Sequence, residues 1–493
     1  MQVMPATLSM LSMPAFAVRQ RHRLGTLAVI APLPRQLGEL KRGRLSFIQI
    51  AEAIGDQPNG VEEAAIVVGV IREDRVRGAG ESDVAMRIAV TGIGAVTPLG
   101  IGREELWASL LAGRHGFAPV ESFDTSAFRV HLGAEVRGFS PAPYVRALDP
   151  ALLGRASQLA IAASRLALAD AGLDDWLEGD QWGVTGERAG LALGTTSGES
   201  REIERFDDRY LAGQLDAVGG EFMARYPCHM IAAHVARELG LAGVNTMIPA
   251  ACAAGNYAVA HAVDTLRAGR ADLMLAGGAD AFSRTTFAGF ARLGAIAPER
   301  CQPFDRGRKG MIPGEGSAVL VLEPLAAARR RGARIYAEVA GYGLSCDAHH
   351  MTAAHPEGDG AARAMEGALA DAGVKPEDVS YISAHGTGTP TNDRLETLAV
   401  QRVFGDAAPQ TPMSSIKSMI GHTMGAASAI EALVCSLAVA TGWIPPTMNM
   451  EEPDGDLDYV PNRSRQHDVR VAMNNAYAFG GNNASVIFRR VDA

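Results

Sequence analysis

A cysteine at a strand-to-helix junction is the first residue of this chain that could do covalent chemistry. Cys252 stands in the run Ile-Pro-Ala-Ala-Cys-Ala-Ala-Gly-Asn, after a short β-favouring segment that Pro249 ends because proline fixes φ and lacks an N–H. An alanine-rich stretch follows as far as Gly269 and predicts a helix. Unpaired N–H groups at a helix start favour an anion, so we expect the thiol to be shifted toward thiolate and to act as a nucleophile. The alternative is a buried cysteine that only packs beneath a helix.

Three basic residues of the second half could serve such a nucleophile. His385 opens the run His-Gly-Thr-Gly-Thr-Pro, Lys417 lies in Ser-Ser-Ile-Lys, and His422 lies in Gly-His-Thr-Met-Gly. The apolar residues after His422 recur at helical spacing, which predicts a helix with His422 in its first turn. A cation is disfavoured there, so we expect a neutral imidazole that donates through an N–H. Either histidine alone is more often an ordinary polar residue, but together with Cys252 they indicate a catalytic site.

The elements that must position these groups form two related halves. Residues 167–172 and 368–373 both read Ala-Leu-Ala-Asp-Ala-Gly, and each run ends an amphipathic helix with a glycine cap. A strand and a glycine- and threonine-rich turn follow in each half. We expect one half over residues 86–335 with Cys252, and a second over 336–493 with the two histidines and Lys417. The first half is longer, with a predicted insertion around residues 201–241 that we expect to cover a site or a subunit interface. The reactive groups should meet at the seam between the halves, where ligands bind in such sheets.

Composition narrows the class of protein. The chain has 493 residues, of which 47% are hydrophobic and 20% charged, as is usual for a globular enzyme. Its formal charge of −9 argues against a nucleic-acid partner. The five cysteines are scattered and odd in number, so neither a disulfide framework nor a zinc pattern is indicated, and a cytoplasmic location is expected. We expect no membrane-spanning helix, since apolar runs of sufficient length are interrupted by polar residues.

The N-terminal region differs from the rest of the chain. Residues 1–85 are rich in arginine near their start, and Met86 stands directly before the first convincing strand. We interpret this region as a poorly ordered extension or as residues translated from upstream of the true start, and not as a targeting peptide. After the strand that begins at Arg87, the run Gly92-Ile-Gly94 could suggest a dinucleotide-binding loop. We reject that interpretation because Thr97 replaces the third glycine and Pro98 interrupts the helix.

Taken in order, the motifs resemble those of a known family. They are Ala-Cys252-Ala, Gly314-Glu-Gly, His385-Gly-Thr-Gly-Thr-Pro, Lys417 with Gly-His422, and Phe479-Gly-Gly-Asn-Asn. This pattern resembles the β-ketoacyl-acyl-carrier-protein synthases of type I/II, condensing enzymes of the thiolase superfamily, from about residue 87 to the C-terminus. The resemblance implies an α/β fold of two pseudo-symmetric halves in αβαβα layers and an acyltransferase of the EC 2.3.1 class. It implies no cofactor and no metal.

The resemblance also implies a ping-pong condensation. Cys252 takes an acyl chain as a thioester, and a malonyl thioester then loses carbon dioxide to give a carbanion that attacks the acyl carbon. His385 and His422 would stabilise the enolate through neutral N–H groups. The backbone N–H groups of Cys252 and Phe479 would form the oxyanion hole.

Supporting roles follow from the same resemblance. Lys417 would orient the site and hold its electrostatics, with Glu396 as a plausible ionic neighbour. Thr387 and Thr389 would contact the phosphopantetheine arm. Phe479 would act as a gate between the acyl pocket and the malonyl site; otherwise it is a plain core aromatic.

Three departures from the family pattern bear on the pathway. Pro249, Lys309 and Asn482 replace the usual threonine, acid and threonine at their positions. With Ala-Cys-Ala-Ala-Gly-Asn and Gly-Thr-Pro-Thr-Asn-Asp, they make the chain look closer to specialised ketosynthases of the nodulation or polyene and polyketide type. Both fatty-acid elongation and a dedicated pathway stay open.

The partners implied are an acyl carrier protein and a second subunit, in either a homodimer or a ketosynthase heterodimer. Two alternatives differ in chemistry. A chain-length-factor-like subunit would be non-catalytic, and Cys252 speaks against it. A cysteine thioester hydrolase would give hydrolysis without carbon–carbon bond formation.

Overall fold

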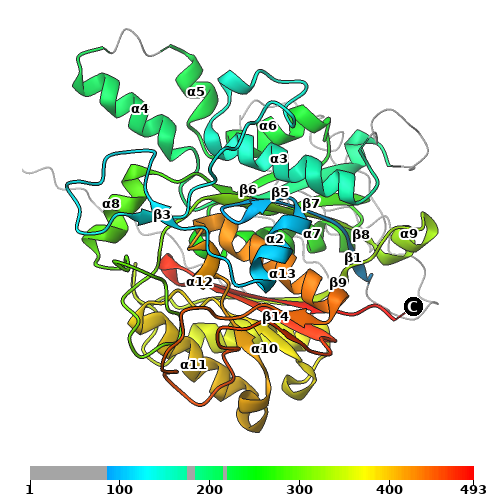
Figure 1. The fold of residues 1–493 in the computed structure, drawn as a ribbon. Helices are drawn as coiled ribbons and strands as arrows, with labels where there is room; N and C mark the ends of the chain where they lie inside the picture. The colour runs from blue at the N-terminus through cyan, green and yellow to red at the C-terminus, as the bar shows by residue number, and fades with distance from the viewer. Residues whose placement is uncertain (1–85, 175–183, 215–218, 493) are drawn as a thin grey trace, which may run out of the picture. The chain divides into compact units, whose positions relative to one another are not determined.

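One mixed β-sheet carries most of the strands of the computed structural model, which describes residues 86–174, 184–214 and 219–492 (Figure 1). The extension predicted for residues 1–85 lies outside these ranges. The strands of this sheet are β1 (Ile88–Thr97), β2 (Gly100–Ile101), β5 (Ala189–Gly194), β6 (Asn245–Ile248), β7 (Leu273–Asp280), β8 (Gly316–Pro324), β9 (Ala337–Cys346), β10 (Tyr381–Ser383), β11 (Met413–Ser414), β14 (Val471–Tyr477) and β15 (Asn482–Arg489). Two small two-stranded sheets lie apart from it: β3 (Ala118–Pro119) with β4 (Leu132–Gly133), and β12 (Trp443–Ile444) with β13 (Arg465–Gln466).

The strand order repeats between the two halves. The sheet runs β11-β10-β14-β15-β9-β1-β8-β7-β5-β6, and β2 pairs with β1 beside this path. Along the chain, the first half of the sheet contains β1, β5, β6, β7 and β8. Their order in the sheet is β1, β8, β7, β5 and β6, that is, first, fifth, fourth, second and third along the chain. The second half has the same order of first, fifth, fourth, second and third, with β9, β15, β14, β10 and β11. The directions agree as well: β7, β5 and β6 are mutually parallel, as are β14, β10 and β11, and the remaining pairs are antiparallel. The predicted duplication is therefore present.

Helices cover the outer faces of the two halves of the sheet, and further helices lie between these halves. They are α2 (Arg103–Leu111), α3 (Arg155–Asp170), α4 (Ser200–Leu211), α5 (Glu221–Arg225), α6 (His229–Leu239), α7 (Ala254–Arg267), α8 (Arg284–Arg292), α9 (Leu325–Arg330), α10 (Asp359–Ala372), α11 (Pro390–Phe404), α12 (Lys417–Ile420) and α13 (Ala427–Thr441). α3 packs on β1 and β8, α10 packs on β9 and β15, and α7 and α13 pack against each other. Figure 1 shows α7 and α13 between the two halves of the sheet, with α3 and α6 above and α10 and α11 below. This is the layered αβαβα fold that the family resemblance implies.

The repeated hexapeptides end equivalent helices. Gly172 follows α3 at φ +70° and Gly373 follows α10 at φ +61°. Both angles lie in the left-handed region that glycine adopts without steric cost. The predicted glycine caps are confirmed.

Gly92 and Gly94 of β1 allow helix α3 to pack close to this strand. β1 continues through Gly92 and Gly94 instead of ending in a loop. A Cβ at Gly94 would lie 2.1 Å from the carbonyl oxygen of Ala163 on α3, and one at Gly343 would lie 2.1 Å from that of Ala364 on α10. The first strand of each half therefore needs glycine for its helix to lie against it, which gives a structural reason for the Gly-Ile-Gly pattern.

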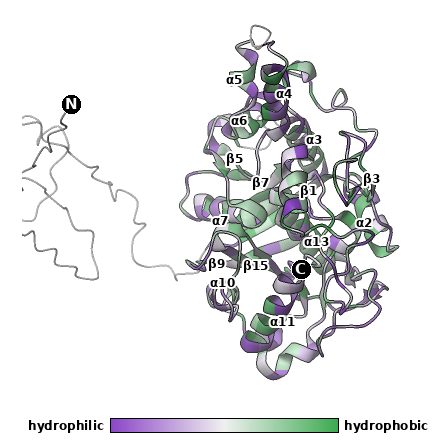
Figure 2. Cartoon of the chain, turned by 90° about the vertical axis from the view of Figure 1, so that its left-hand side faces the viewer, coloured by the Kyte–Doolittle hydropathy of each residue, from purple (hydrophilic) through white to green (hydrophobic). Residues whose placement is uncertain are grey.

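The centre of the fold is a strongly apolar helix. In the described part of the chain, residues 424–441 alone are long and hydrophobic enough to match a membrane span, and 89% of this stretch is buried inside the protein. It comprises α13 and the turn before it, so it is the core helix of the middle layer. The outer helices α4 and α11 instead alternate hydrophilic and hydrophobic residues (Figure 2).

The predicted insertion at residues 201–241 holds α4, α5 and α6. α6 packs on α3 and β6, so it belongs to the body of the fold. α4 contacts α5 and α8, and the rings of Phe206 and Phe222 stack with their centroids 4.8 Å apart. Whether this part covers a site or a subunit interface stays a prediction.

Candidate active site

Cys252 lies at a strained turn between β6 and α7. A single turn of 3-10 helix, η6 (Ala251–Ala253), joins the two elements, and Ala251 has φ +48°. A non-glycine residue in this region is strained and persists only where its surroundings hold it. Cys252 is 7% exposed. The elbow predicted from the sequence is therefore present, with the nucleophile candidate almost enclosed.

The structure brings together the three residues that the sequence singled out. His385 follows β10 in the second half, and His422 follows α12. One atom each from Cys252, His385 and His422 lie within 4.8 Å of one another, and all three residues are buried. The two imidazole centroids are 5.6 Å apart with planes at 85°. One small ligand group can therefore touch the thiol and both rings.

Lys417 supplies a buried positive charge beside the histidines. Its ammonium nitrogen lies 3.5 Å from Nδ1 of His385 and forms an ion pair with Glu431 of α13. Both members of this pair are at most 1% exposed. Because an ammonium has donors only, the contact leaves the imidazole proton of His385 on Nε2. Sequence reasoning missed Glu431, although a glutamate within an apolar helical stripe signals a buried charge that needs a partner.

Glu396 holds the backbone of the loop that carries His385. Its two carboxylate oxygens accept hydrogen bonds from the N–H groups of His385 at 2.8 Å and Gly386 at 2.7 Å. Burial raises the pKa of Glu396 to about 8, and these bonds and the charge of Lys417 oppose that shift. Glu396 thus lies within the electrostatic reach of Lys417, as expected, but the direct ion-pair partner is Glu431.

The position of His422 differs from the prediction. His422 precedes α13 by five residues instead of occupying its first turn, because a separate 3-10 turn, η9 (Met424–Ala426), intervenes. Its Nδ1 accepts a hydrogen bond from the N–H of Met424 at 3.2 Å, which places the proton on Nε2. The pKa values of His422 and His385 are both lowered well below the usual value by burial and by Lys417. The rings are neutral as expected, but burial and a nearby cation are the cause instead of a helix dipole.

The protonation of the thiol also corrects the prediction. Burial raises the pKa of Cys252 to about 12, although Lys417 opposes the shift and Asp280 adds to it. Cys252 is therefore a neutral thiol at neutral pH. The start of α7 does not outweigh the loss of solvation around a sulfur that is nearly enclosed.

Phe479 lies in a turn that packs against the cysteine elbow. The turn η10 (Phe479–Gly481) follows β14 and contacts η6. Gly480 has φ +82° inside this turn, a backbone conformation that glycine supplies. The phenyl ring is 39% exposed and lies 5.7 Å from that of Phe290 on α8. Phe479 is therefore a half-exposed side chain beside the nucleophile, and not the plain core aromatic of the alternative interpretation.

The threonine loop after His385 forms a compact turn. The hydroxyls of Thr387 and Thr389 lie 2.8 Å apart. Between them Gly388 has φ +79°, and a Cβ there would lie 2.8 Å from the carbonyl oxygen of Gly310. The N–H of Gly310 donates to the carbonyl oxygen of Gly388 at 2.9 Å, so the segment around residue 310 clamps this loop.

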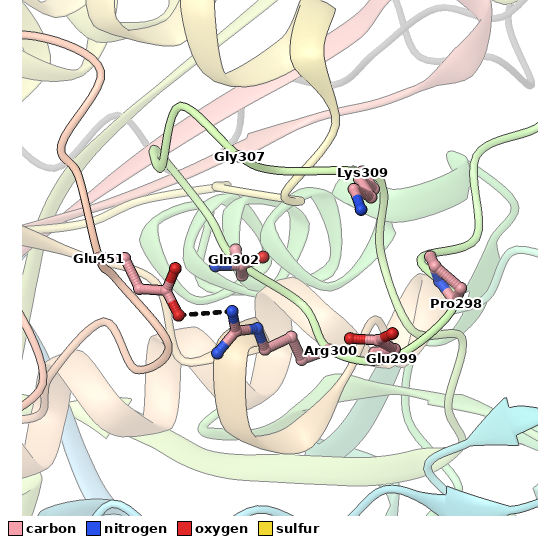
Figure 3. A pocket seen from close by; sticks show the side chains of 7 residues that line it. All are labelled: Pro298, Glu299, Arg300, Gln302, Gly307, Lys309 and Glu451. Atoms are coloured by element: carbon pink, nitrogen blue, oxygen red, sulfur yellow. Dashed lines mark hydrogen bonds and ion pairs between the residues drawn. The ribbon is translucent and has the colours of Figure 1, made fainter.

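A surface cavity of about 220 Å³ opens beside that clamp (Figure 3). It contains none of the three clustered residues. Lys309 points into it, and no carboxylate in the described part of the chain lies within ion-pair distance of this lysine, whereas Arg300 pairs with Glu451 at 2.5 Å. The residues that line it are Pro298, Glu299, Arg300, Gln302, Gly307, Lys309 and Glu451. Lys309, which replaces the acidic residue usual in the family, therefore faces solvent next to the threonine loop.

The fold and the cluster define a condensing enzyme of the thiolase-like class, and comparison with known proteins agrees. Residues 85–328 match the sequence profile of the β-ketoacyl synthase N-terminal domain, and residues 336–451 match that of its C-terminal domain. The chain therefore belongs to the β-ketoacyl synthase family and is an enzyme of the acyltransferase class.

Curated relatives and solved structures cover nearly all of the described chain. The 3-oxoacyl-[acyl-carrier-protein] synthase 2 of Coxiella burnetii is 38% identical over 82% of this chain and 99% of its own length, and that of Staphylococcus aureus is 36% identical over 83% and 99%. Among structures, the ishigamide ketosynthase/chain length factor is 44% identical with a TM-score of 0.79. A ketosynthase bound to a hexaketide in complex with its acyl-carrier protein is 32% identical with a TM-score of 0.76. Each covers 83% of this chain and is itself covered completely.

Proposed function

We propose that the chain catalyses a decarboxylative Claisen condensation between an acyl thioester and malonyl-acyl carrier protein. The observation that carries the proposal is the meeting of one thiol and two neutral imidazoles within 4.8 Å. A thiol can hold the acyl group, and neutral N–H donors suit the enolate that decarboxylation generates. The product is a β-ketoacyl-acyl carrier protein.

In the first half-reaction the sulfur of Cys252 attacks the acyl carbon of the donor thioester. A new S–C bond forms, the S–C bond to the carrier breaks, and the proton of the Cys252 thiol ends on the departing pantetheine sulfur. Since the pKa of Cys252 is about 12, the thiol must lose its proton as the bond forms. The N–H groups of Cys252 and Phe479 are the proposed oxyanion hole for the tetrahedral intermediate.

In the second half-reaction the malonyl group loses carbon dioxide, and the electron pair of the broken C–C bond forms an enolate. Nε2–H of His385 and Nε2–H of His422 donate to the thioester oxygen that carries the developing charge. The enolate carbon then attacks the acyl carbon on Cys252. The S–C bond to Cys252 breaks, and the released thiolate regains a proton from solvent.

The remaining residues position these reactants. Lys417 fixes the tautomer of His385 at a contact of 3.5 Å, and Glu396 holds the backbone of that loop. The hydroxyls of Thr387 and Thr389 would bind the amides of the phosphopantetheine arm. Phe479, whose ring lies 5.7 Å from that of Phe290, would be the gate.

The chemistry proposed needs no resident cofactor, because the electrons come from the malonyl C–C bond and phosphopantetheine arrives as part of the substrate. The ammonium of Lys417, 3.5 Å from His385, disfavours a metal cation at the cluster. We therefore assign the cluster to substrate.

For the biological setting we favour a dedicated secondary pathway with a second ketosynthase-type subunit. One support is that Pro249, Lys309 and Asn482 depart from the usual residues of the family. Another is that the sequence identity of this chain to the ishigamide ketosynthase/chain length factor is higher than its identity to the two 3-oxoacyl-[acyl-carrier-protein] synthases named above. All five cysteines are free thiols, which suits a reducing cytoplasm.

The test supplies an acyl-carrier thioester and malonyl-carrier protein and measures the β-keto product by mass spectrometry. Wild type and Cys228→Ala, which removes a thiol outside the cluster, should both form product, whereas Cys252→Ala should form none. Product from Cys252→Ala would discard the nucleophile. Free acid without β-keto product from wild type would indicate a thioester hydrolase, and no acyl-enzyme at all would indicate a non-catalytic subunit.

A further inference from the structure

Asp280 is a fully buried carboxylate at the end of β7 that joins three separate segments. It is 0% exposed. Its oxygens accept hydrogen bonds from the hydroxyl of Thr195 at 2.8 Å and from the N–H groups of Thr196 at 2.7 Å, Ser197 at 3.0 Å and Gly425 at 2.6 Å. The first three donors follow β5 in the first half, whereas Gly425 belongs to η9 in the second half. Asp280 therefore ties the second half to the strand ends of the first.

The hydrogen bond from Gly425 to Asp280 lies beside Met424, a residue with a strained backbone. Met424 has φ +53°, and it stands three residues before the start of α13, as Ala251 at φ +48° stands three residues before the start of α7. Gly425 thus has the place in the second repeat that Cys252 has in the first. A residue in this region needs its neighbours to hold it, and the bond from Gly425 to Asp280 does so directly after Met424.

The strained residue in turn sets the tautomer of His422. The N–H of Met424 donates to Nδ1 of His422 at 3.2 Å, so the proton lies on Nε2, which faces the cluster. The backbone of His422 is fixed independently, because its N–H donates to Ile312 at 2.6 Å and its carbonyl accepts from Gly314 at 2.8 Å. Loss of the bond to Asp280 would therefore free the imidazole tautomer and ring angle without releasing the backbone of His422.

We propose that Asp280 is a positioning residue for the decarboxylation step, acting through Gly425 and Met424 to keep the proton of His422 on Nε2. The inference rests on the proposed function for its effect on rate. Its effect on the tautomer of His422 and on the bond to Gly425 does not depend on that function.

The first test uses wild-type protein with ¹⁵N-labelled histidine. The chain has 12 histidines, and the His422 signals are assigned as those lost in His422→Gln. Nitrogen shifts should show Nε2–H across the pH range in which the protein is folded. Hydrogen exchange should show the N–H of Gly425 protected as strongly as β7. A proton on Nδ1, or rapid exchange at Gly425, overturns the proposal without any variant of Asp280.

The second test compares two half-reactions in Asp280→Asn. The amide cannot accept from all four donors, so the bond to Gly425 should weaken. We expect decarboxylation of malonyl-acyl carrier protein to fall at least about tenfold, a mixture of His422 tautomers to appear, and acylation of Cys252 to change by less than about threefold. Unchanged decarboxylation, or an equal loss in both half-reactions, contradicts the proposal.

The control is Glu199→Gln. Glu199 is also 0% exposed and accepts from the backbone N–H groups of Ala156 at 3.1 Å and Ser157 at 2.7 Å, but it holds the start of α3 instead of η9. It should lower stability to a similar degree and leave the ratio of the two half-reactions unchanged. If Glu199→Gln changes the ratio of decarboxylation to acylation by a similar amount, the effect of Asp280→Asn is a general consequence of losing a buried carboxylate.

A double-mutant cycle shows whether Asp280 acts through His422. In the His422→Gln background, Asp280→Asn should cause no further loss of decarboxylation beyond about twofold, because the group whose tautomer it sets is gone. Losses that multiply would show that Asp280 acts on another step, and they would reject this assignment even if the enzyme remains a ketosynthase.

Discussion

The ammonium nitrogen of Lys417 lies 3.5 Å from Nδ1 of His385 and is also ion-paired with Glu431. This arrangement places a full positive charge against a neutral imidazole inside a buried site. Together with burial, which is the larger cause, this charge lowers the pKa of both histidines, and it opposes the rise that burial causes in the pKa of Cys252. Lys417 therefore acts on all three clustered residues.

Variants of Lys417, beginning with Lys417→Met, should distinguish what the Lys417–Glu431 ion pair contributes to protein stability from what Lys417 contributes to catalysis. Breaking a buried ion pair by removing one partner costs about 3–5 kcal/mol of unfolding free energy, because Glu431 is left buried and unpaired. The double variant Lys417→Met/Glu431→Gln should regain most of that stability, measured by urea denaturation. Condensation should stay low in both variants, since His385 has lost the donor to Nδ1. Recovery of activity in the double variant would contradict a catalytic role for Lys417.

The reactivity of Cys252 should rise steadily with pH. Because the thiol pKa is about 12, the thiolate fraction measured without substrate should increase about tenfold per pH unit from about pH 6 to about pH 9. The check is the rate of Cys252 alkylation by iodoacetamide, followed by mass spectrometry of the labelled peptide. A plateau near neutral pH would instead show a pre-formed thiolate, as the helix-start argument from sequence predicts.

Glu396 should make the protein less stable as pH rises. Its pKa is about 8 in the folded protein against an ordinary value of 4.5, so between about pH 5 and about pH 8 the folded state binds more protons than the unfolded state. The free energy of unfolding contributed by this group is greatest below pH 4.5 and falls as pH rises through the folded pKa. In urea denaturation Glu396→Gln should flatten this slope, and the exposed Glu366→Gln should not. The same slope in Glu396→Gln as in wild type would assign the pH dependence to other groups.

Thr389→Val should weaken binding of the carrier-bound substrates. Loss of one hydrogen bond to the pantetheine arm costs about 1 kcal/mol, which raises KM for malonyl-acyl carrier protein about fivefold and leaves kcat within about twofold. Thr397→Val is a control for the same substitution nearby, because Thr397 lies inside α11, which Thr389 directly precedes, and donates its hydroxyl to the backbone of Asp393. An unchanged KM in Thr389→Val would place the arm elsewhere.

The sequence by itself predicted the candidate reacting groups and the local elements. The order of Cys252, His385 and His422, each on a junction with glycine or alanine nearby, indicated the chemistry. The repeated hexapeptides indicated two halves of the same construction. These features are local, since propensity, capping and short spacing decide them within a few residues.

Tertiary structure alone decided the charges and the partners. Asp280 and Gly425 are 145 residues apart along the chain and form a hydrogen bond of 2.6 Å, and nothing near either residue indicates the other. Likewise the pKa of Cys252 is set by how completely the whole fold excludes water from its sulfur, which outweighs the helix start visible in the sequence. Burial and long-range pairing sum contributions from segments far apart in the chain, so they exist only once the two halves have packed against each other.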